Sequence, residues 1–332
     1  MTSQVVVVGI SGPSSSGKTT LARLLRTVYN PTQGSNADIR TLLVHEDDFY
    51  KPDDRIPVTT TSSGKLVQDW DTIEAFDIKQ FVSCLSHIRQ TGSFPPKLKS
   101  KEDLNDATDS GVDEATIHAL RERITQRLQQ ASLSRQQKST SSQCQKSDEQ
   151  TPWLTIVFVD GFLLYAPPND SAHPLRPVHD QIDLPIFLPV TYPLLKERRE
   201  GRTGYVTIGP APTPVPREPD NAEEESKDEQ VDSETAEDDP PVNFWTDPPG
   251  YVDDIVWPRY VSNCSWLLLP DAITGANLGL DELKNLVGDG ANVREDLGIF
   301  VAPEKGKASM PHLLDWAVEL IFNKIEGTTQ AK

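Results

Sequence analysis

The sequence predicts an α/β protein built on a doubly wound parallel sheet, with low-complexity insertions between its elements. Short runs of β-branched, apolar residues alternate along the chain with segments whose apolar residues recur at helical spacing. A loop rich in glycine and serine follows the first of these runs. Such alternation is typical of parallel strands joined by helices that cover both faces of one sheet. We therefore interpret residues 1–332 as a single domain that carries insertions.

The first half of the chain is predicted to contain three strands with two helices between them. Val5 to Ile10 is continuously apolar and β-branched, the pattern of a strand buried on both faces of a parallel sheet. Lys18 to Val28 carries leucines at helical spacing, so the glycine-rich loop leads into a helix. The next three elements are predicted to be a strand, a helix and a strand, at Ile39 to Val44, Ile73 to Ile88 and Leu154 to Val159.

The second half adds two short apolar runs and two helices. We expect strands at Ile182 to Val190 and at Trp266 to Leu269, separated by a helix near Tyr192 to Arg199. A final helix is predicted over Leu313 to Ile325, where apolar residues again recur at helical spacing.

Two polar stretches interrupt this pattern. Residues 100–150 contain one helical stripe, which predicts an appended helix, and from Ser134 onward we expect disorder. Residues 209–240 are rich in proline and hold twelve acidic residues against Arg217 and Lys227, a net charge of −10. We expect this second insertion to be disordered, and its composition identifies no protein partner. The helical stripe in the first insertion, residues 100–150, consists of Ile117, Leu120, Ile124 and Leu128.

Composition excludes several classes of protein. The 32 basic and 50 acidic residues give a net charge of −18, which argues against a protein that coats nucleic acid. The three cysteines are far apart and form no CxxC pair, so neither a disulfide framework nor a zinc site is indicated. The apolar run at Val5 to Ile10 is too short to span a membrane. We expect a cytoplasmic protein, with access to the nucleus possible.

Gly12 to Thr19 match the phosphate-loop pattern G-x-x-x-x-G-K-[ST] at every fixed position, between a predicted strand and a predicted helix. In this pattern backbone N–H groups surround phosphate oxygens at a helix N-terminus, the lysine contacts the outer phosphates, and the last hydroxyl binds Mg²⁺. The pattern predicts an ATP site in which Lys18 acts in catalysis and Thr19 is a Mg²⁺ ligand. The residues expected to contact ATP here are Gly12, Ser14, Ser15, Ser16, Gly17, Lys18, Thr19 and Thr20.

Acidic residues follow two of the other predicted strands. Asp160 comes directly after the strand at Leu154 to Val159, where it is placed to supply a second contact to Mg²⁺. Asp47 follows the strand at Ile39 to Val44, at the sheet edge where doubly wound folds bind ligands. A carboxylate there can orient an attacking hydroxyl and accept its proton, so we predict Asp47 to be the catalytic base. For the neighbouring Asp48 we expect only a helix cap or a surface turn.

Five motifs follow one another along the chain: the phosphate loop, Asp47 to Pro52, Asp69 to Phe76, Val159 to Leu164, and Pro248 to Pro258. In their residues and their order they resemble the nicotinamide riboside kinase family. Uridine kinases and phosphoribulokinase share the broader fold and the phosphate loop. The narrower resemblance therefore depends on the Asp-Trp-Asp run at Asp69 and the Pro-Pro-Gly-Tyr segment at Pro248. The long insertions depart from the family pattern, and no motif is matched after Leu269.

The resemblance implies that ATP phosphorylates the ribose 5′-hydroxyl of nicotinamide riboside, giving the mononucleotide in NAD salvage. Asp47 would be the base, and Asp71 would accept hydrogen bonds from the ribose 2′ and 3′ hydroxyls. Trp70 would lie against the pyridinium ring, with Tyr205 as the second aromatic face. Asp160 takes the place of a glutamate that is usual in human-type members. The segment that carries Arg199 and Arg202 resembles the family's lid, which implies that these arginines contact the phosphates and the nucleotide. The acidic insertion interrupts this region.

Two other readings remain open from the sequence. The same scaffold serves uridine, cytidine and other small-molecule kinases, and a panel of substrates with ATP distinguishes them. The chain could instead be a nucleotide-regulated interaction protein whose working surface is the acidic insertion. Asp47 argues against this second alternative, because a switch protein needs no base that activates a hydroxyl.

Overall fold

One five-stranded parallel sheet organises the part of the chain that the structure describes. The structure is a computed structural model and describes residues 4–30, 39–96, 100, 109–138, 152–202, 204–208, 242–268, 282 and 293–330. The strands lie in the order β2-β5-β1-β6-β9, with every neighbouring pair parallel. Their bounds are β1 Gln4–Ser11, β2 Ile39–His45, β5 Leu154–Gly161, β6 Leu184–Phe187 and β9 Phe300–Val301. The predicted fold class is confirmed.

The central position of β1 follows from its apolar residues, which are buried on both faces. Val7 belongs to the core on one side of the sheet, and Val6 and Val8 belong to the core on the other. β1 pairs with β5 in register from Gln4 opposite Leu154 to Ser11 opposite Gly161. Both strands therefore end at the same edge, which is where the sequence concentrates its polar motifs.

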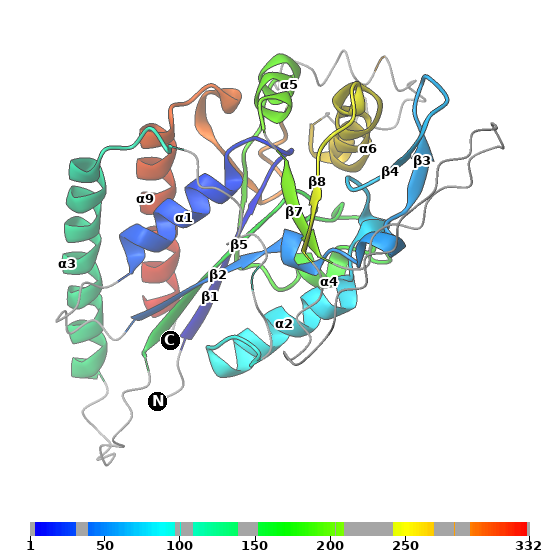
Figure 1. The fold of residues 1–332 in the computed structure, drawn as a ribbon. Coiled ribbons are helices and arrows are strands. Elements are labelled where there is room, and N and C mark those ends of the chain that lie inside the picture. Colours follow the sequence, from blue (N-terminus) through cyan, green and yellow to red (C-terminus); the bar gives the residue numbers. More distant parts are fainter. Residues whose placement is uncertain are drawn as a thin grey trace, which may run out of the picture.

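Helices cover both faces of the sheet. α1 (Lys18–Tyr29), α3 (Glu114–Lys138) and α9 (Met310–Gln330) lie on one face, while α2 (Ile78–Thr91) and α4 (Arg176–His179) lie on the other (Figure 1). The predicted helix over Ile73 to Ile88 divides into a 3₁₀ turn at Ile73–Ala75 and α2. α2 starts late because the Asp77 side chain caps it, accepting a hydrogen bond from Gln80 N at 2.9 Å.

The helical stripe of the first insertion is an integral part of the core. All four stripe residues are buried against α1 and α9, so α3 is a third helix of this layer instead of an appendage. Arg127 of α3 donates to Glu319 of α9 at 2.8 Å, and its guanidinium lies 3.6 Å from the centre of the Phe322 ring. The prediction of disorder from Ser134 is wrong as far as Lys138, where the helix ends. Glutamine, arginine and lysine favour helix, which offsets their polarity.

The prediction of a strand at Trp266 to Leu269 is also wrong. Residues up to Leu268 belong to α6 (Trp257–Leu268), in which Tyr260, Cys264 and Leu267 are buried at helical spacing. The fifth strand of the sheet is instead β9, of only two residues. A short apolar run fits a buried strand and a buried helix equally well, and here the apolar residues before it continue the helical period.

The elements that remain lie beyond the carboxyl edge of the sheet. α5 (Tyr192–Glu200) follows β6, and two small hairpins pair β3 (Val58–Thr60) with β4 (Leu66–Gln68) and β7 (Tyr205–Ile208) with β8 (Val242–Trp245). The predicted disorder of 209–240, and of the rest of 100–150 apart from the described segments, falls outside the described residues. Within the residues that the structure describes, we find no helix with the length and apolar character needed to cross a membrane.

Candidate active site

The phosphate loop connects the end of β1 to the start of α1, and two of its glycines are required by geometry. Gly12 has φ +150°, and a Cβ there would lie 2.3 Å from the carbonyl oxygen of Leu188. Gly17 precedes α1 in the left-handed region, with φ +94°. Any residue with a Cβ atom would be strained at both positions. The loop can therefore bring its backbone N–H groups close to an anion at the N-terminus of α1.

Lys18 is buried beneath this loop. Its ammonium donates a hydrogen bond to Pro13 O at 2.9 Å, which holds the side chain along the loop. Burial lowers the pKa of Lys18, while the nearby carboxylates of Asp160 and Asp47 act in the opposite direction. One cation thus lies close to both acids that the sequence singled out.

Thr19 and Asp160 meet at the carboxyl edge of the sheet. Thr19 Oγ1 donates to Asp160 Oδ2 at 2.5 Å, and Asp160 Oδ1 lies 2.5 Å from His45 Nδ1 at the end of β2. Burial acts to raise the pKa of Asp160, but His45, Thr19 and Lys18 together hold that pKa below its usual value. The carboxylate therefore stays charged. Mg²⁺ typically takes one or two protein oxygens together with phosphates and water, so this pair of donors fits it.

Asp47 is the second residue of a turn that lies directly after β2. The turn is a 3₁₀ helix, Glu46–Phe49, in which Asp47 is half-buried and lines the same cavity as Lys18 and Asp160. Burial and the Asp160 carboxylate raise the pKa of Asp47, and Lys18 opposes them. A carboxyl group with a raised pKa is a stronger proton acceptor, as the role of base requires.

Glu46 fixes the loop that follows β5. This side chain has no exposed surface, and its Oε2 accepts hydrogen bonds from Phe162 N at 2.7 Å and Leu163 N at 3.1 Å. Burial raises the pKa of Glu46 to about 8. A buried carboxyl group therefore ties the turn that carries Asp47 to the loop that follows β5, the strand that carries Asp160.

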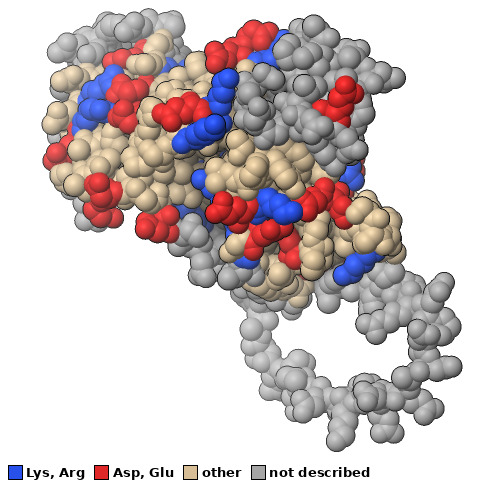
Figure 2. Space-filling view, turned by 90° about the horizontal axis from the view of Figure 1, so that it is seen from above, with Lys and Arg blue, Asp and Glu red and all other residues tan. Residues whose placement is uncertain are grey.

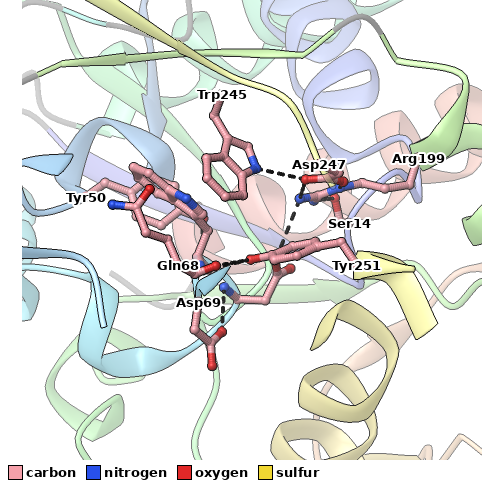
Figure 3. Close-up of polar contacts among 10 residues, drawn as sticks. Ser14, Tyr50, Gln68, Asp69, Arg199, Trp245, Asp247 and Tyr251 are labelled. Atoms are coloured by element: carbon pink, nitrogen blue, oxygen red, sulfur yellow. Dashed lines mark hydrogen bonds and ion pairs between the residues drawn. The ribbon is translucent and has the colours of Figure 1, made fainter. Parts of the chain in front are cut away.

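Arg199 of α5 links three parts of the site (Figure 3). Its Nε and Nη2 donate to the two carboxylate oxygens of Asp247 at 2.6 and 3.1 Å, and its Nη1 donates to Ser14 Oγ at 2.6 Å. Asp71 Oδ2 lies 3.7 Å from Nη2. Burial raises the pKa of Asp71 to about 6, and Arg199 acts in the opposite direction. The phosphate loop, the segment with Asp71 and the segment after β8 thus share one guanidinium group.

Aromatic side chains form the wall opposite the phosphate loop. The Trp70 ring lies 5.2 Å from the Tyr50 ring and 5.7 Å from the Trp245 ring, measured between ring centres. Tyr205 lies elsewhere on the wall, with the guanidinium groups of Arg199 and Arg202 4.7 and 5.1 Å from its ring centre. Tyr50 and Trp245 are therefore the rings beside Trp70, and the Tyr205 ring lies beside the two arginines on the same cavity wall.

One cavity brings together most of the residues predicted from the sequence. Those on its wall are Ser14, Ser15, Gly17, Lys18, Thr19, Thr20, Asp47, Trp70, Asp160, Arg199, Arg202 and Tyr205. Gly12, Ser16 and Asp71 are not on this wall, and Asp71 lines a smaller neighbouring cavity. Two further residues were not predicted from the sequence: Trp245, which lies on the wall, and Asp247, which binds Arg199. Their position directly before the matched Pro248 motif is the signal that could have found them.

Figure 2 views the molecule from above, turned by 90° from Figure 1. On this face the basic and acidic side chains of the described residues are interspersed, and neither sign forms one continuous surface (Figure 2). The cations that matter for an anionic ligand are instead those lining the cavity, namely Lys18, Arg199 and Arg202. Positive charge that could face an anionic ligand is therefore found on the cavity wall.

A parallel sheet whose central strand leads into a phosphate-loop sequence, with a carboxylate and a lysine beside that loop and an arginine-bearing helix nearby, is consistent with a P-loop kinase fold. The chain is 28% identical to the nicotinamide riboside kinase of Schizosaccharomyces pombe, over 98% of this chain and 100% of that protein. It is also 28% identical to those of Saccharomyces cerevisiae, over 83% of this chain and 84% of that protein, and Eremothecium gossypii, over 77% and 75%. These similarities, over most of each chain, support the resemblance to nicotinamide riboside kinases that the motifs indicate. No protein-family model matches it.

Proposed function

We propose that the chain transfers the γ-phosphoryl group of ATP to the ribose 5′-hydroxyl of nicotinamide riboside, giving nicotinamide mononucleotide and ADP. The observation that carries this proposal is the meeting of Asp47 with Lys18, Thr19 and Asp160 on one cavity wall, opposite the indole of Trp70. A phosphate site and a base that share a cavity with an aromatic wall support transfer to a nucleoside hydroxyl.

The phosphate side of the reaction depends on positioning and charge neutralisation. Backbone N–H groups of the loop and the Lys18 ammonium would surround the outer phosphates. Thr19 and Asp160 would hold Mg²⁺, which when bound neutralises charge on the phosphate oxygens. Arg199 and Arg202, both on the cavity wall, would add positive charge from the opposite side.

On the acceptor side Asp47 would orient the 5′-hydroxyl and take its proton. The 5′ oxygen then bonds to the γ-phosphorus while the bond from that phosphorus to the β–γ bridging oxygen breaks. ADP leaves with the bridging oxygen, and the proton resides on Asp47 until solvent removes it. The raised pKa of Asp47 supports this role, because it makes the carboxylate a better acceptor.

The nicotinamide end would lie on the aromatic wall. The Trp70 indole presents a flat π-face, which suits a pyridinium cation, and Asp71 would accept the ribose diol. The ring centres of Trp70 and Trp245 are 5.7 Å apart, so a nicotinamide ring that stacks between them would need the hairpin of β7 and β8, which carries Trp245, to move away from Trp70.

Release of ADP, measured with and without nicotinamide riboside, tests the proposal. We expect ADP and the mononucleotide to form in equal amounts and only in the presence of the nucleoside. Uridine and cytidine form the matched panel, and a preference for either would replace nicotinamide riboside by a pyrimidine nucleoside. ATP hydrolysis without any acceptor would favour the alternative of a nucleotide-regulated protein.

The proposed setting is NAD salvage in the cytoplasm, with access to the nucleus. The cysteines support a reducing compartment, since Cys84 and Cys264 are both buried free thiols. Fractionation of cells that express the tagged chain tests this location.

A further inference from the structure

The segment that presents Trp70 and Asp71 lies outside regular secondary structure. β4 ends at Gln68, and the next helical turn begins only at Ile73. Its backbone groups therefore need partners from elsewhere, because unpaired buried N–H and C=O groups are costly. The side chains that supply those partners determine where the indole of Trp70 and the carboxylate of Asp71 lie.

A single hydroxyl group holds two of these backbone groups (Figure 3). Tyr251 Oη accepts a hydrogen bond from Trp70 N at 3.0 Å and donates one to Gln68 O at 3.0 Å. The Tyr251 side chain is buried, with 1% of its surface exposed. Burial raises the pKa of Tyr251 well above its usual value, so the hydroxyl keeps the proton that the second bond requires. This hydroxyl thus fixes the main chain on both sides of Asp69.

The ring of the same tyrosine supports the second tryptophan. Its centre lies 5.8 Å from that of Trp245, with the two planes inclined at 64°. Tyr251 itself is fixed by a turn in which its N–H donates to Pro248 O at 3.0 Å and Gly250 adopts φ +81°. A π-helix, Val252–Val256, follows at once, and such local departures from the α-helix are frequent at functional sites.

We propose that Tyr251 is a positioning residue for nucleoside selection, which sets the spacing of Trp70 and Trp245 through its hydroxyl and its ring. The inference rests on the proposed function, since it assigns the aromatic wall to the base of the nucleoside. Without the hydroxyl, Trp70 N and Gln68 O lose a buried partner and the segment relaxes. The two indoles, whose ring centres are 5.7 Å apart, then no longer hold one arrangement, and the aromatic surface that they present becomes less selective for a flat pyridinium ring. We expect ATP on the loop side of the cavity, so the KM for ATP should not change.

Tyr251→Phe tests the role of the hydroxyl, because it keeps the ring against Trp245. We expect kcat/KM for nicotinamide riboside to fall roughly five- to thirtyfold, mainly through KM, with KM for ATP within about twofold of wild type. The ratio of kcat/KM for nicotinamide riboside to that for uridine should fall as well. Tyr260→Phe is the matched control: it also removes a buried phenol hydroxyl, one that makes no hydrogen bond to the described residues.

A double-mutant cycle separates positioning from a general loss of structure. If Tyr251 acts through the wall, Tyr251→Phe should cost much less in a Trp70→Leu background than in the wild type. Additive losses, equal rises in both KM values, or the same losses in Tyr260→Phe would overturn the inference. A wild-type enzyme inactive on nicotinamide riboside would refute the proposed function instead. In that case thermal unfolding of Tyr251→Phe would still show whether the hydroxyl holds the segment.

Discussion

Arg199 and Asp247 form a two-point ion pair at the edge of the cavity, with Nε to Oδ2 at 2.6 Å and Nη2 to Oδ1 at 3.1 Å. The third contact of the guanidinium group, to Ser14 Oγ, joins this pair to the phosphate loop. All three contacts can form at once because the guanidinium group is planar and carries several N–H donors. One side chain therefore joins α5, the segment after β8 and the loop.

Arg199→Lys should impair both substrates. A lysine ammonium is a point charge and cannot reproduce the fork, so the loop and the hairpin lose their common anchor. We expect kcat/KM to fall by about tenfold or more for ATP and for the nucleoside, as steady-state kinetics would show. Arg26→Lys, on the exposed face of α1, should leave both values unchanged. An effect on only one substrate would contradict the anchoring role.

Asp47→Asn should reduce catalysis with little effect on binding. The amide keeps the size of the side chain but loses its basicity, and kcat should fall by roughly 10²–10⁴. Asp48→Asn is the matched control, because Asp48 accepts a hydrogen bond from Ser100 Oγ and is not on the cavity wall. We expect its kcat to stay within about threefold of wild type. A change confined to KM would make Asp47 a binding residue.

Glu46→Gln should flatten the dependence of stability on pH. The pKa of Glu46 is raised to about 8 in the folded state. The folded protein therefore binds a proton at Glu46 more tightly than the unfolded chain does. Its contribution to stability is complete below the ordinary pKa near 4.5 and is lost as the pH rises to about 8. The slope is at most about 1.4 kcal/mol per pH unit. Urea unfolding at pH 5 to 8 measures it for wild type, for Glu46→Gln and for the exposed Glu122→Gln. Parallel curves for all three would refute the prediction.

Much of the fold could be predicted because its signals are local. The strand at Val5, the phosphate loop and α1 are consecutive in sequence, and each pattern there has one structural meaning. The run at Trp266 is too short to distinguish strand from helix, and the two residues of β9 carry no period at all. For such elements the tertiary packing decides.

The predicted site residues divide in the same way. Lys18 and Asp160 follow from motifs and from the strands that precede them. The partners Asp247 and Tyr251 contact residues that lie 48 and 181 positions away in the chain, so their roles arise only from the tertiary fold. The role of Tyr205 stays a prediction: the resemblance implies an aromatic face for the nucleoside, and its ring lies on the cavity wall beside two guanidinium groups.

Binding of the nucleoside should weaken at acidic pH. The pKa of Asp71 is raised to about 6, mainly by burial, and only its carboxylate can accept hydrogen bonds from both ribose hydroxyls. Between pH 7 and pH 5 the ionised fraction falls about tenfold, and KM for nicotinamide riboside should rise by a similar factor at saturating ATP. Asp71→Asn should remove this dependence, and a substrate without the ribose diol should not show it. A pH-independent KM in the wild type would place the diol elsewhere.

The choice of nucleoside should depend on the face of Trp70. Trp70→Leu keeps apolar bulk but removes the π-face, so we expect nicotinamide riboside to bind about 0.5–2 kcal/mol more weakly while the KM for ATP stays constant. Trp70→Phe retains a smaller π-face, so its binding of nicotinamide riboside should weaken less than that of Trp70→Leu. Because Trp70 is 5% exposed and packs against Tyr50 and Trp245, each variant needs a thermal unfolding curve that shows a folded protein.

Trp245→Leu and Tyr205→Leu then assign the second aromatic face. Trp245 contacts Trp70 directly, so its loss should weaken the nucleoside about as much as the loss of Trp70 does. Tyr205 supports Arg199 and Arg202, so its loss should act on ATP as well. If instead Tyr205→Leu weakens only the nucleoside and Trp245→Leu has no effect, the hairpin must rearrange on binding so that Tyr205 replaces Trp245 opposite the indole of Trp70.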